Sequence, residues 1–263
     1  MNADARDQSI LDADGVSVRL GHRLVVEGAS LALRRGELSV LVGPNGAGKT
    51  TLIRALAGLV GSEGRIRLDG RPLCELGPRE RARQIAYLPQ GHVFYWPLSA
   101  AAVVALGRHP HADPFARPTD ADRAAVAHAL AATDSIEFAE RSVLTLSGGE
   151  RARVALARAL ATEAPVLLAD EPTASLDPRH QLIVMEQLRK AAHAGGAVLA
   201  IMHDLALAAR FADRVLVMQS GRIVADAPPA DALSTEQIAS AFGVEAALVD
   251  VGARSLPIAL RPL

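Results

Sequence analysis

The residues most suited to chemistry form a loop at residues 43–50, with the sequence GPNGAGKT, here called the phosphate loop. Its glycines allow backbone N–H groups to turn inward around a phosphate, while a lysine can bridge phosphate oxygens and a threonine hydroxyl can bind Mg²⁺. The chain has only two lysines, Lys49 and Lys190, so a lysine at this point indicates a need for a compact ammonium. The predicted phosphate-binding residues are Gly43, Pro44, Asn45, Gly46, Ala47, Gly48, Lys49, Thr50 and Thr51.

Two carboxylates follow another apolar run, VLLADEP at residues 166–172. A buried strand would deliver Asp170 at its carboxyl end, where it can hold a metal shared with Thr50, directly or through water. Because neighbouring strand residues face opposite ways, Glu171 is expected to point elsewhere and to polarise an attacking water as a general base. The alternative is an ordinary solvated acidic pair, and the upstream phosphate loop favours the metal and catalytic roles.

Two further side chains remain open from the sequence alone. His203 ends the apolar run 197–202 and would emerge at the sheet edge where ligands of open α/β folds bind, within reach of a terminal phosphate. A purely structural histidine is equally compatible with that position. Gln90, in YLPQG, is either an exposed loop amide or a ligand of a metal or water at the nucleotide.

A second candidate anion receptor lies far downstream, in TLSGGERARVALARAL at residues 145–160. Ser147, Gly148 and Gly149 precede a predicted helix whose N-terminus offers N–H groups and positive dipole. A helical insert separates this motif from Lys49, so a single chain is not expected to close both over the same phosphates. We predict a two-fold head-to-tail dimer in which each motif faces the γ-phosphate held by the other copy, with hydrolysis allowing the dimer to open.

The hydrophobic pattern predicts the elements that position these residues. Nearly continuous apolar runs predict strands buried on both faces, and the helical patterns between them indicate a parallel α/β core. The expected strands are 37–42, 166–170, 197–202 and 214–218, and the expected helices are 181–192 and 205–211.

Outside this core, the pattern predicts antiparallel and helical parts. Alternating residues from Gly15 to Leu33, around a turn at Gly21-His22, predict a β-hairpin, and a second short hairpin follows at 65–70. Residues 99–162 are alanine-rich and helical in period, with a capping box formed by Thr119 and Asp122. Near the end, a short strand after Gly221 and a helix capped by Ser234 to Phe242 are expected, followed by a tail that the pattern does not place.

Composition limits the class of protein. The 263 residues are half hydrophobic with a net charge of −1, which gives no electrostatic footprint for nucleic acid, so no nucleic-acid partner is expected. A single cysteine, Cys74, and an N-terminus without a signal-like apolar core indicate a reducing cytoplasm. The apolar stretches are far shorter than the ~20 residues of a membrane span, so any membrane role is expected to be peripheral.

The motifs GPNGAGKT, LSGGE, VLLADEP and ASLDP, together with Gln90 and His203, resemble the nucleotide-binding subunits of ATP-binding-cassette transporters in order and spacing over nearly the whole chain. The resemblance implies an α/β P-loop NTPase with a RecA-like parallel core, an N-terminal antiparallel β subdomain and an inserted α-helical subdomain. It implies ATP and Mg²⁺ as cofactors, metal ligation by Thr50, Gln90 and Asp170, and catalysis by Glu171 and His203. It also makes Ser175 to Asp177 a dimer-contact loop and Gln90 part of a loop that senses a membrane partner.

The same resemblance suggests boundaries within one ATPase domain over residues 1–263. The core with its β subdomain would span about 13–91 and 164–228, the helical subdomain about 92–163, and a C-terminal extension 229–263.

Finer features are similar to the importer branch for iron complexes, including siderophores and haem, and for cobalamin. They are AYLPQ, a WPLS element, ALGRHPH, MHDLALAARFADRVLVMQSGRIVADAPP and a helix ending AFGV. This implies a homodimer that works with two permease subunits and, indirectly, a periplasmic or lipid-anchored substrate-binding protein, at the cytoplasmic face of the inner membrane. A soluble cassette ATPase that acts as a scaffold or remodelling factor is the alternative, while a small-molecule kinase would leave LSGGE unexplained.

One departure from the family pattern and one cluster of aromatic residues remain. Members of this family have an aromatic residue that stacks on adenine just before the first hairpin turn, but Leu20 occupies that place, which leaves His22 as a candidate substitute. Four of the eight aromatic residues fall in one segment, as Tyr87, Phe94, Tyr95 and Trp96. They could fill a local core or form a groove that receives a cytoplasmic helix of a permease.

Overall fold

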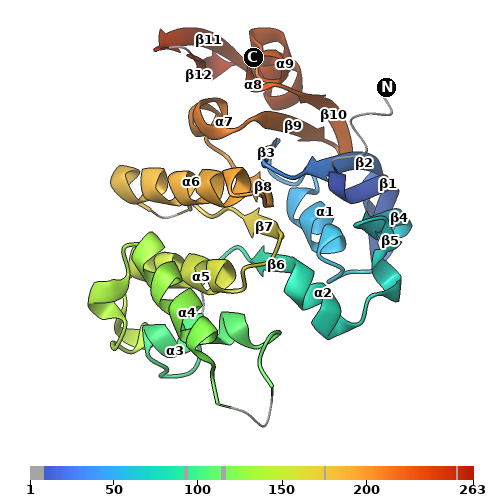
Figure 1. The fold of residues 1–263 in the computed structure, drawn as a ribbon. Helices are drawn as coiled ribbons and strands as arrows, with labels where there is room; N and C mark the ends of the chain where they lie inside the picture. Colours follow the sequence, from blue (N-terminus) through green and yellow to red (C-terminus); the bar gives the residue numbers. More distant parts are fainter. Residues whose placement is uncertain (1–8, 92–93, 114–116, 175, 253) are drawn as a thin grey trace.

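The computed structural model describes residues 9–91, 94–113, 117–174, 176–252 and 254–263 (Figure 1). Its centre is a six-stranded sheet in the order β10-β9-β3-β8-β7-β6. All neighbouring pairs are parallel except β10 with β9. The strands are β3 (Glu37–Val42), β6 (Ile85–Leu88), β7 (Val166–Asp170), β8 (Ala197–Ile201), β9 (Arg214–Gln219) and β10 (Arg222–Ala227). The predicted parallel α/β core is therefore confirmed.

The central strands are apolar on both sides because helices cover both faces of the sheet (Figure 1). On one face, Leu41 and Leu168 pack with α1 (Lys49–Leu56). On the other, Val40 and Leu167 pack with α5, α6 and α7. These helices span Gly148–Ala161, Pro178–His193 and Leu205–Phe211. The alternation along each strand sends successive side chains into different halves of the core, which explains the nearly continuous apolar runs.

A second, antiparallel sheet covers α1 in the order β2-β1-β4-β5. Its strands are β1 (Ser9–Leu20), β2 (Arg23–Arg34), β4 (Glu63–Leu68) and β5 (Arg71–Pro72). Both predicted hairpins are confirmed, but the first begins at Ser9 rather than at Gly15. The register of β1 against β2 shifts between Ala13 and Val16, and Gly15 has φ 62°, so a bulge interrupts the alternation that marks a strand.

The segment that the sequence predicts as helical contains α3 (Ala100–Ala105), α4 (Asp120–Ala132) and α5, with 3₁₀ turns at Leu106–Arg108, Ile136–Phe138 and Val143–Thr145. These elements bury a small core of their own around Phe138, Val104 and Val154. Thr119 and Asp122 form the predicted capping box at the start of α4. Within the described part of this segment, the only extended pairing is an isolated bridge between Ser99 and Ser142.

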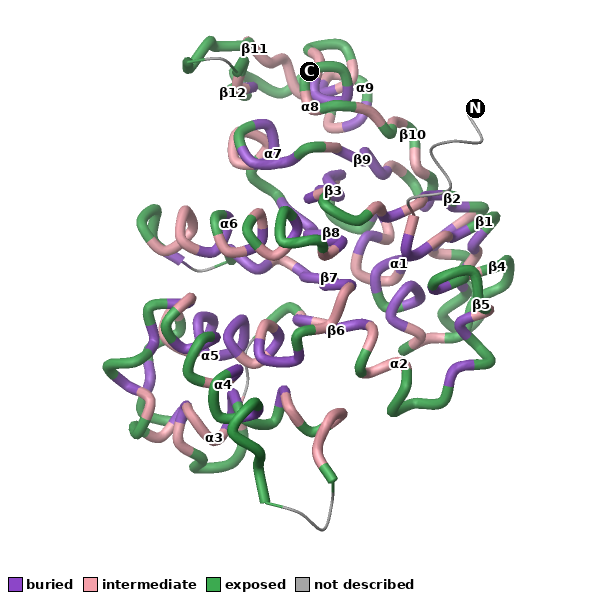
Figure 2. Tube along the Cα trace, viewed as in Figure 1, coloured by how far each residue is buried: buried purple, intermediate pink, exposed green. Residues whose placement is uncertain are grey.

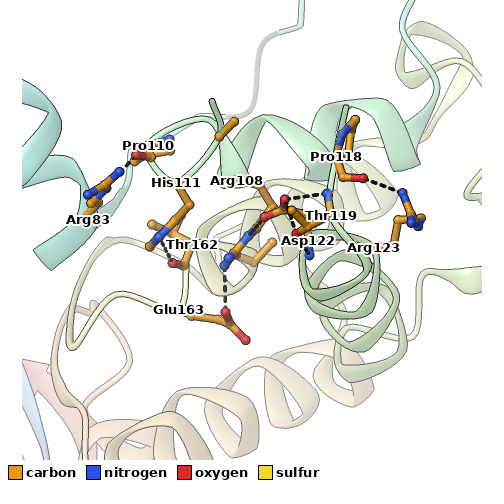
Figure 3. Close-up of polar contacts among 12 residues, drawn as sticks. Arg83, Arg108, Pro110, His111, Pro118, Thr119, Asp122, Arg123, Thr162 and Glu163 are labelled. Atoms are coloured by element: carbon orange, nitrogen blue, oxygen red, sulfur yellow. Dashed lines mark hydrogen bonds and ion pairs between the residues drawn. The ribbon is translucent and has the colours of Figure 1, made fainter. Parts of the chain in front are cut away.

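Polar contacts fix the connection between α3 and α4 (Figure 3). Arg83, on α2 (Pro78–Gln84), donates to the Pro110 carbonyl oxygen at 2.8 Å. His111 donates from Nε2 to the Thr162 carbonyl oxygen at 2.9 Å. A 3₁₀ turn at Leu73–Glu75 precedes α2. The connection between α3 and α4 is therefore tied both to α2 and to the end of α5.

The C-terminal part carries α8 (Pro229–Ala232), α9 (Thr235–Phe242) and a hairpin of β11 (Val244–Val251) and β12 (Arg254–Pro262). Ser234 caps α9, with its Oγ accepting from the Gln237 N–H at 3.3 Å. The hairpin accounts for the tail that the sequence pattern leaves unplaced. The second half of β11 and most of β12 are exposed (Figure 2). Arg254 anchors the hairpin by donating to the Ala209 carbonyl oxygen at 2.8 Å. In the described ranges, no helix is long and apolar enough to span a membrane.

Candidate nucleotide-binding site

The phosphate loop connects β3 to α1, and two of its glycines are required by geometry. Gly43 has φ 154°, and a Cβ there would lie 2.1 Å from the Met218 carbonyl oxygen. Gly48 has φ 101°, and a Cβ there would lie 2.7 Å from the Val25 carbonyl oxygen. No side chain caps the N-terminus of α1. The first N–H groups of the helix therefore keep their capacity to bind an anion.

Lys49 lies at the centre of this loop with only 6% of its surface exposed. Its Nζ donates to the carbonyl oxygens of Gly43 at 2.7 Å and Pro44 at 3.0 Å. Burial lowers the pKa of the Lys49 ammonium, whereas the nearby carboxylates of Glu171 and Asp170 act in the opposite direction. A buried ammonium that is hydrogen-bonded to neutral carbonyls retains a strong attraction for a phosphate.

Thr50 and Asp170 bring two oxygen donors together across the chain. Thr50 Oγ1 donates to Asp170 Oδ1 at 3.1 Å, and the Tyr87 hydroxyl donates to Asp170 Oδ2 at 3.4 Å. Asp170 is fully buried at the end of β7, and burial raises the pKa of its carboxyl while the Thr50 hydrogen bond opposes that rise. Hydroxyl and carboxylate oxygens are the ligands that Mg²⁺ prefers, so this donor pair fits a magnesium ion.

Glu171 and His203 meet at the same edge of the sheet. The His203 imidazole donates to Glu171, with Nε2 and Oε1 2.6 Å apart. Strand alternation does not set the direction of Glu171, because β7 ends at Asp170 and Glu171 has a left-handed backbone with φ 53°. The two carboxylates do differ in their surroundings, as expected, but the reason given for the difference was wrong. The left-handed backbone turn at Glu171, rather than the alternation of a strand, separates Glu171 from Asp170.

These groups face one cleft of about 870 Å³. It is lined by Leu20, Arg23, Val25, Asn45, Gly46, Ala47, Gly48, Lys49, Thr50, Thr51, Gln90, Glu171 and His203. Gly43 and Pro44 do not line the cleft, but their carbonyl oxygens accept hydrogen bonds from Lys49. Asp170 likewise lies behind the lining and accepts a hydrogen bond from Thr50. The cleft therefore assembles most of the residues that the sequence singles out, from segments far apart in the chain.

The LSGGE residues do not line this cleft. Ser147 caps α5, with its Oγ accepting from the Glu150 N–H at 3.2 Å and its N–H donating to Glu150 Oε2 at 2.7 Å. That backbone hydrogen bond lowers the pKa of the Glu150 carboxyl. Ser147 and Gly148 are exposed. In one copy, the second receptor is thus formed and accessible but lies outside the first.

Arg23 is a cleft residue that the sequence analysis missed. Leu20 and Arg23 are direct partners across the two-residue turn of the β1–β2 hairpin, so both side chains lie on one face. His22, the candidate substitute for an adenine-stacking aromatic, sits in the turn and does not line the cleft. The pairing rule for a two-residue hairpin loop would have pointed to position 23 once Leu20 was assigned to the site.

In two other predicted segments, the individual residues differ in where they lie. In the dimer-contact loop, Ser175 lies outside the described residues, and Asp177 caps α6 by accepting from the His180 N–H at 3.0 Å. In the aromatic segment, Tyr87 and Phe94 pack against core residues. Tyr95 and Trp96 are 81% and 74% exposed. The core-filling interpretation therefore applies to Tyr87 and Phe94. The exposed side chains of Tyr95 and Trp96 remain available for a partner.

Comparison with known proteins adds sequence relatives. The family described as ABC transporter matches residues 26–174. The chain is 50% identical to the hemin import ATP-binding protein HmuV of Streptomyces coelicolor over 220 residues, covering 83% of this chain and 78% of that protein. It is 42% identical to the cobalamin import ATP-binding protein BtuD of Halobacterium salinarum over 240 residues, covering 90% of this chain and 60% of that protein.

Solved structures share the fold. An ATP-binding subunit of an ABC transporter is similar with a TM-score of 0.76 and 26% identity, covering 85% of this chain and 91% of that one. A dimeric ATP-binding cassette in a post-hydrolysis state bound to ADP and Pi gives a TM-score of 0.74 and 26% identity, covering 83% of this chain and 98% of that one. Together with the phosphate loop, the carboxylate pair and the LSGGE helix, these similarities show that the chain belongs to the ABC transporter family, as an ATP-binding and ATP-hydrolysing subunit.

Proposed function

We propose that this chain energises the import of an iron complex, with haem favoured over a siderophore or cobalamin, through a separate membrane permease. Its relatives at 50% and 46% identity carry the name hemin import ATP-binding protein, and a cobalamin importer subunit follows at 42%. The structural observation that carries the proposal is the placement of the Thr50–Asp170 and Glu171–His203 pairs at the phosphate loop.

Residues on this chain divide the work of binding and hydrolysis. Lys49 and the N-terminus of α1 hold the phosphates, and Thr50 and Asp170, with Gln90 beside them in the cleft, would hold Mg²⁺. When bound, Mg²⁺ would neutralise phosphate charge. Glu171 accepts the proton of the attacking water, and its hydrogen bond to His203 fixes the orientation of its carboxylate.

The dimer supplies the missing half of each site. Ser147, Gly148 and Gly149 lie at the exposed N-terminus of α5, outside the cleft of their own copy. A two-fold arrangement would place this helix terminus against the γ-phosphate held by the partner copy. Leu176 and Asp177, next to the start of α6, would belong to the contact between the copies. Bound nucleotide then links two chains, and its hydrolysis releases them.

We place this dimer at the cytoplasmic face of the inner membrane, in contact with two permease subunits and, through them, with a periplasmic or lipid-anchored binding protein. Tyr95 and Trp96 are the exposed aromatic residues of the segment that follows Gln90. Exposed aromatic side chains are typical of interface centres, which supports a permease contact there. Residues 1–263 act as one ATPase domain, with the helical part at about 92–163 inserted into the core.

The test is the variant Glu171→Gln, assayed as purified protein. Without a general base, ATP hydrolysis should fall at least about a hundredfold, while ATP binding measured by calorimetry should persist. Glu186→Gln, on an exposed position of α6, serves as the matched control and should hydrolyse ATP at the normal rate. Unchanged hydrolysis in Glu171→Gln would remove Glu171 from the catalytic role proposed for it.

A further inference from the structure

We infer that Arg23, together with Leu20 and Val25, forms the nucleobase site, and that its guanidinium stacks on the base. Such a site grips the base by its face and accepts adenine and guanine alike. The inference rests on the proposed function, because it requires a nucleoside triphosphate on the phosphate loop.

The shape of the cleft leaves one place for the base. The triphosphate end is fixed by Lys49 and Thr50, and the catalytic groups Glu171 and His203 occupy the same end. The remaining wall consists of Leu20, Arg23 and Val25, all from the β1–β2 hairpin. A nucleotide anchored by its phosphates in this cleft must therefore extend its base toward these three side chains.

The hairpin places Leu20 and Arg23 on one face, because they are direct cross-strand partners. The register of β1 against β2 shifts next to this pair and leaves Val25 without a directly opposite residue, and Val25 lines the same cleft. Gly21, with φ 60°, makes the turn between Leu20 and Arg23. His22 is exposed within that turn and does not line the cleft.

This face is held rigidly against the phosphate loop. The Gly221 N–H donates to the Ala47 carbonyl oxygen at 3.0 Å, and the Glu27 N–H donates to the Gly221 carbonyl oxygen at 2.8 Å. The Val25 carbonyl oxygen approaches Gly48 so closely that a Cβ there would lie 2.7 Å away. The base site is thus preformed relative to the phosphate site, which reduces the entropy lost on binding.

The side chains of this wall favour stacking on the face of a flat ring over hydrogen bonding to the edge of the base. In the described structure, the Arg23 side chain makes no hydrogen bond or ion pair, unlike Arg34 and Arg35, which pair with Glu37 and Asp69. An unpaired guanidinium is planar and weakly hydrated, and it stacks well on aromatic rings. Leu20 is 52% exposed and offers an apolar surface beside it. The side chains of Leu20, Arg23 and Val25 include no amide, carboxylate or hydroxyl, so they offer no acceptor to the N–H groups on the edge of a base.

The experiment compares three ligands on the purified protein: MgATP, MgGTP and inorganic tripolyphosphate with Mg²⁺, each titrated by calorimetry. ATP and GTP should bind within about threefold of each other, because every base has a face on which to stack. Arg23→Ala should weaken both by about two- to fivefold. It should leave tripolyphosphate binding unchanged, because that ligand has no base.

Variants of the hairpin separate stacking from charge. Arg23→Lys keeps the charge but loses the plane, so it should recover little of the loss seen in Arg23→Ala. Arg19→Ala removes an exposed arginine of the same hairpin that does not line the cleft, and His22→Ala changes the turn; both should bind like the unmodified protein. Leu20→Tyr adds an aromatic face and should tighten ATP and GTP by about fivefold or more.

Several results would overturn the inference. These are normal nucleotide binding by Arg23→Ala, an equal loss of tripolyphosphate binding in that variant, or a preference for ATP over GTP of about tenfold or more. Full rescue by Arg23→Lys would assign Arg23 to simple charge attraction. If neither ATP nor tripolyphosphate binds the unmodified protein, the proposed function fails and the inference with it, whereas the other failures leave the proposed function standing.

Discussion

At the scale of single residues, the site depends on backbone positions that only particular residues can occupy. Gly43 and Gly48 allow the phosphate loop to pass against the carbonyl oxygens of Met218 and Val25. Glu171 adopts φ 53° although it is not glycine, so the surrounding structure must hold it there. Its hydrogen bond to His203 provides one such restraint. Strain at this position coincides with the group that is proposed to act on water.

Replacing Gly43 by alanine tests the close approach. The new Cβ would meet the Met218 carbonyl oxygen, and the backbone has φ 154°, so the variant should lose about 1–3 kcal/mol or more of unfolding free energy. Chemical denaturation with urea measures that loss. Gly61→Ala is the matched control, because a Cβ there meets open space at an ordinary φ, and its stability should be unchanged or slightly higher. Equal stability of the two variants would contradict the geometric requirement at Gly43.

At the scale of elements, arginines hold the helical part together and tie it to α2. Arg108 bridges from its 3₁₀ turn to Asp122 at 2.9 Å and to Glu163 at 2.7 Å (Figure 3). Arg79 and Arg83 donate to carbonyl oxygens at Ala112 and Pro110. Because these contacts span α2, α4 and α5, a movement of the helical part in response to nucleotide would involve all three helices together.

The ion pair at Asp122 predicts a pH dependence of stability. Hydrogen bonds from Thr119 and Arg108 lower the pKa of the Asp122 carboxyl from 3.8 to about 2. A depressed pKa stabilises the fold above the unfolded value of 3.8, and this contribution is lost as the pH falls toward 2. The difference in Tm between the unmodified protein and Asp122→Asn should therefore be largest at neutral pH and shrink steadily below pH ~4.

The control for this prediction is Asp120→Asn, which alters a surface ion pair with Arg123 in the same first turn of α4. An exposed pair of this kind contributes little, so its Tm should stay close to that of the unmodified protein at every pH. A Tm difference for Asp122→Asn that does not change with pH would mean that packing, rather than the charged state, accounts for its effect.

At the scale of the whole molecule, one copy presents its two predicted anion-binding sites on different surfaces. The phosphate-loop cleft is formed by the core and the β1–β2 hairpin, and the LSGGE helix terminus belongs to the helical part. In the proposed two-fold dimer, each of these surfaces would face the other surface of the second copy.

The dimer predicts a change in size that depends on nucleotide. With ATP bound and hydrolysis blocked by Glu171→Gln, the protein should shift from monomer to dimer in analytical ultracentrifugation, and return to monomer with ADP. Adding Ser147→Arg should prevent the shift, because a bulky cation would occupy the position meant for the partner's phosphate. Ser240→Arg, at an exposed position of α9, should dimerise normally. A monomer at all ATP concentrations, or an undisturbed dimer in the Ser147→Arg variant, would argue against the shared site.

Local sequence patterns were sufficient to predict many of the strands, one capped helix and the phosphate loop. Apolar runs located β3, β7, β8 and β9, and the capping box located α4, because these signals arise from neighbours in the sequence. The phosphate loop was predictable for the same reason, as its chemistry is contained in adjacent residues. The bulge that lets β1 begin at Ser9 and the C-terminal hairpin escaped prediction, because in both the alternation is broken or too short to stand out.

By itself, the sequence determined the fold class, the phosphate loop, the carboxylates after β7 and the LSGGE helix start, since each is encoded by residues close together in the chain. Only the tertiary structure decided which groups meet. It paired His203 with Glu171, ruled His22 out of the cleft lining and brought Arg23 into it, and packed Tyr87 half-buried against the core while leaving Trp96 exposed. These outcomes depend on how distant segments pack and on backbone angles at single positions, which local patterns do not specify.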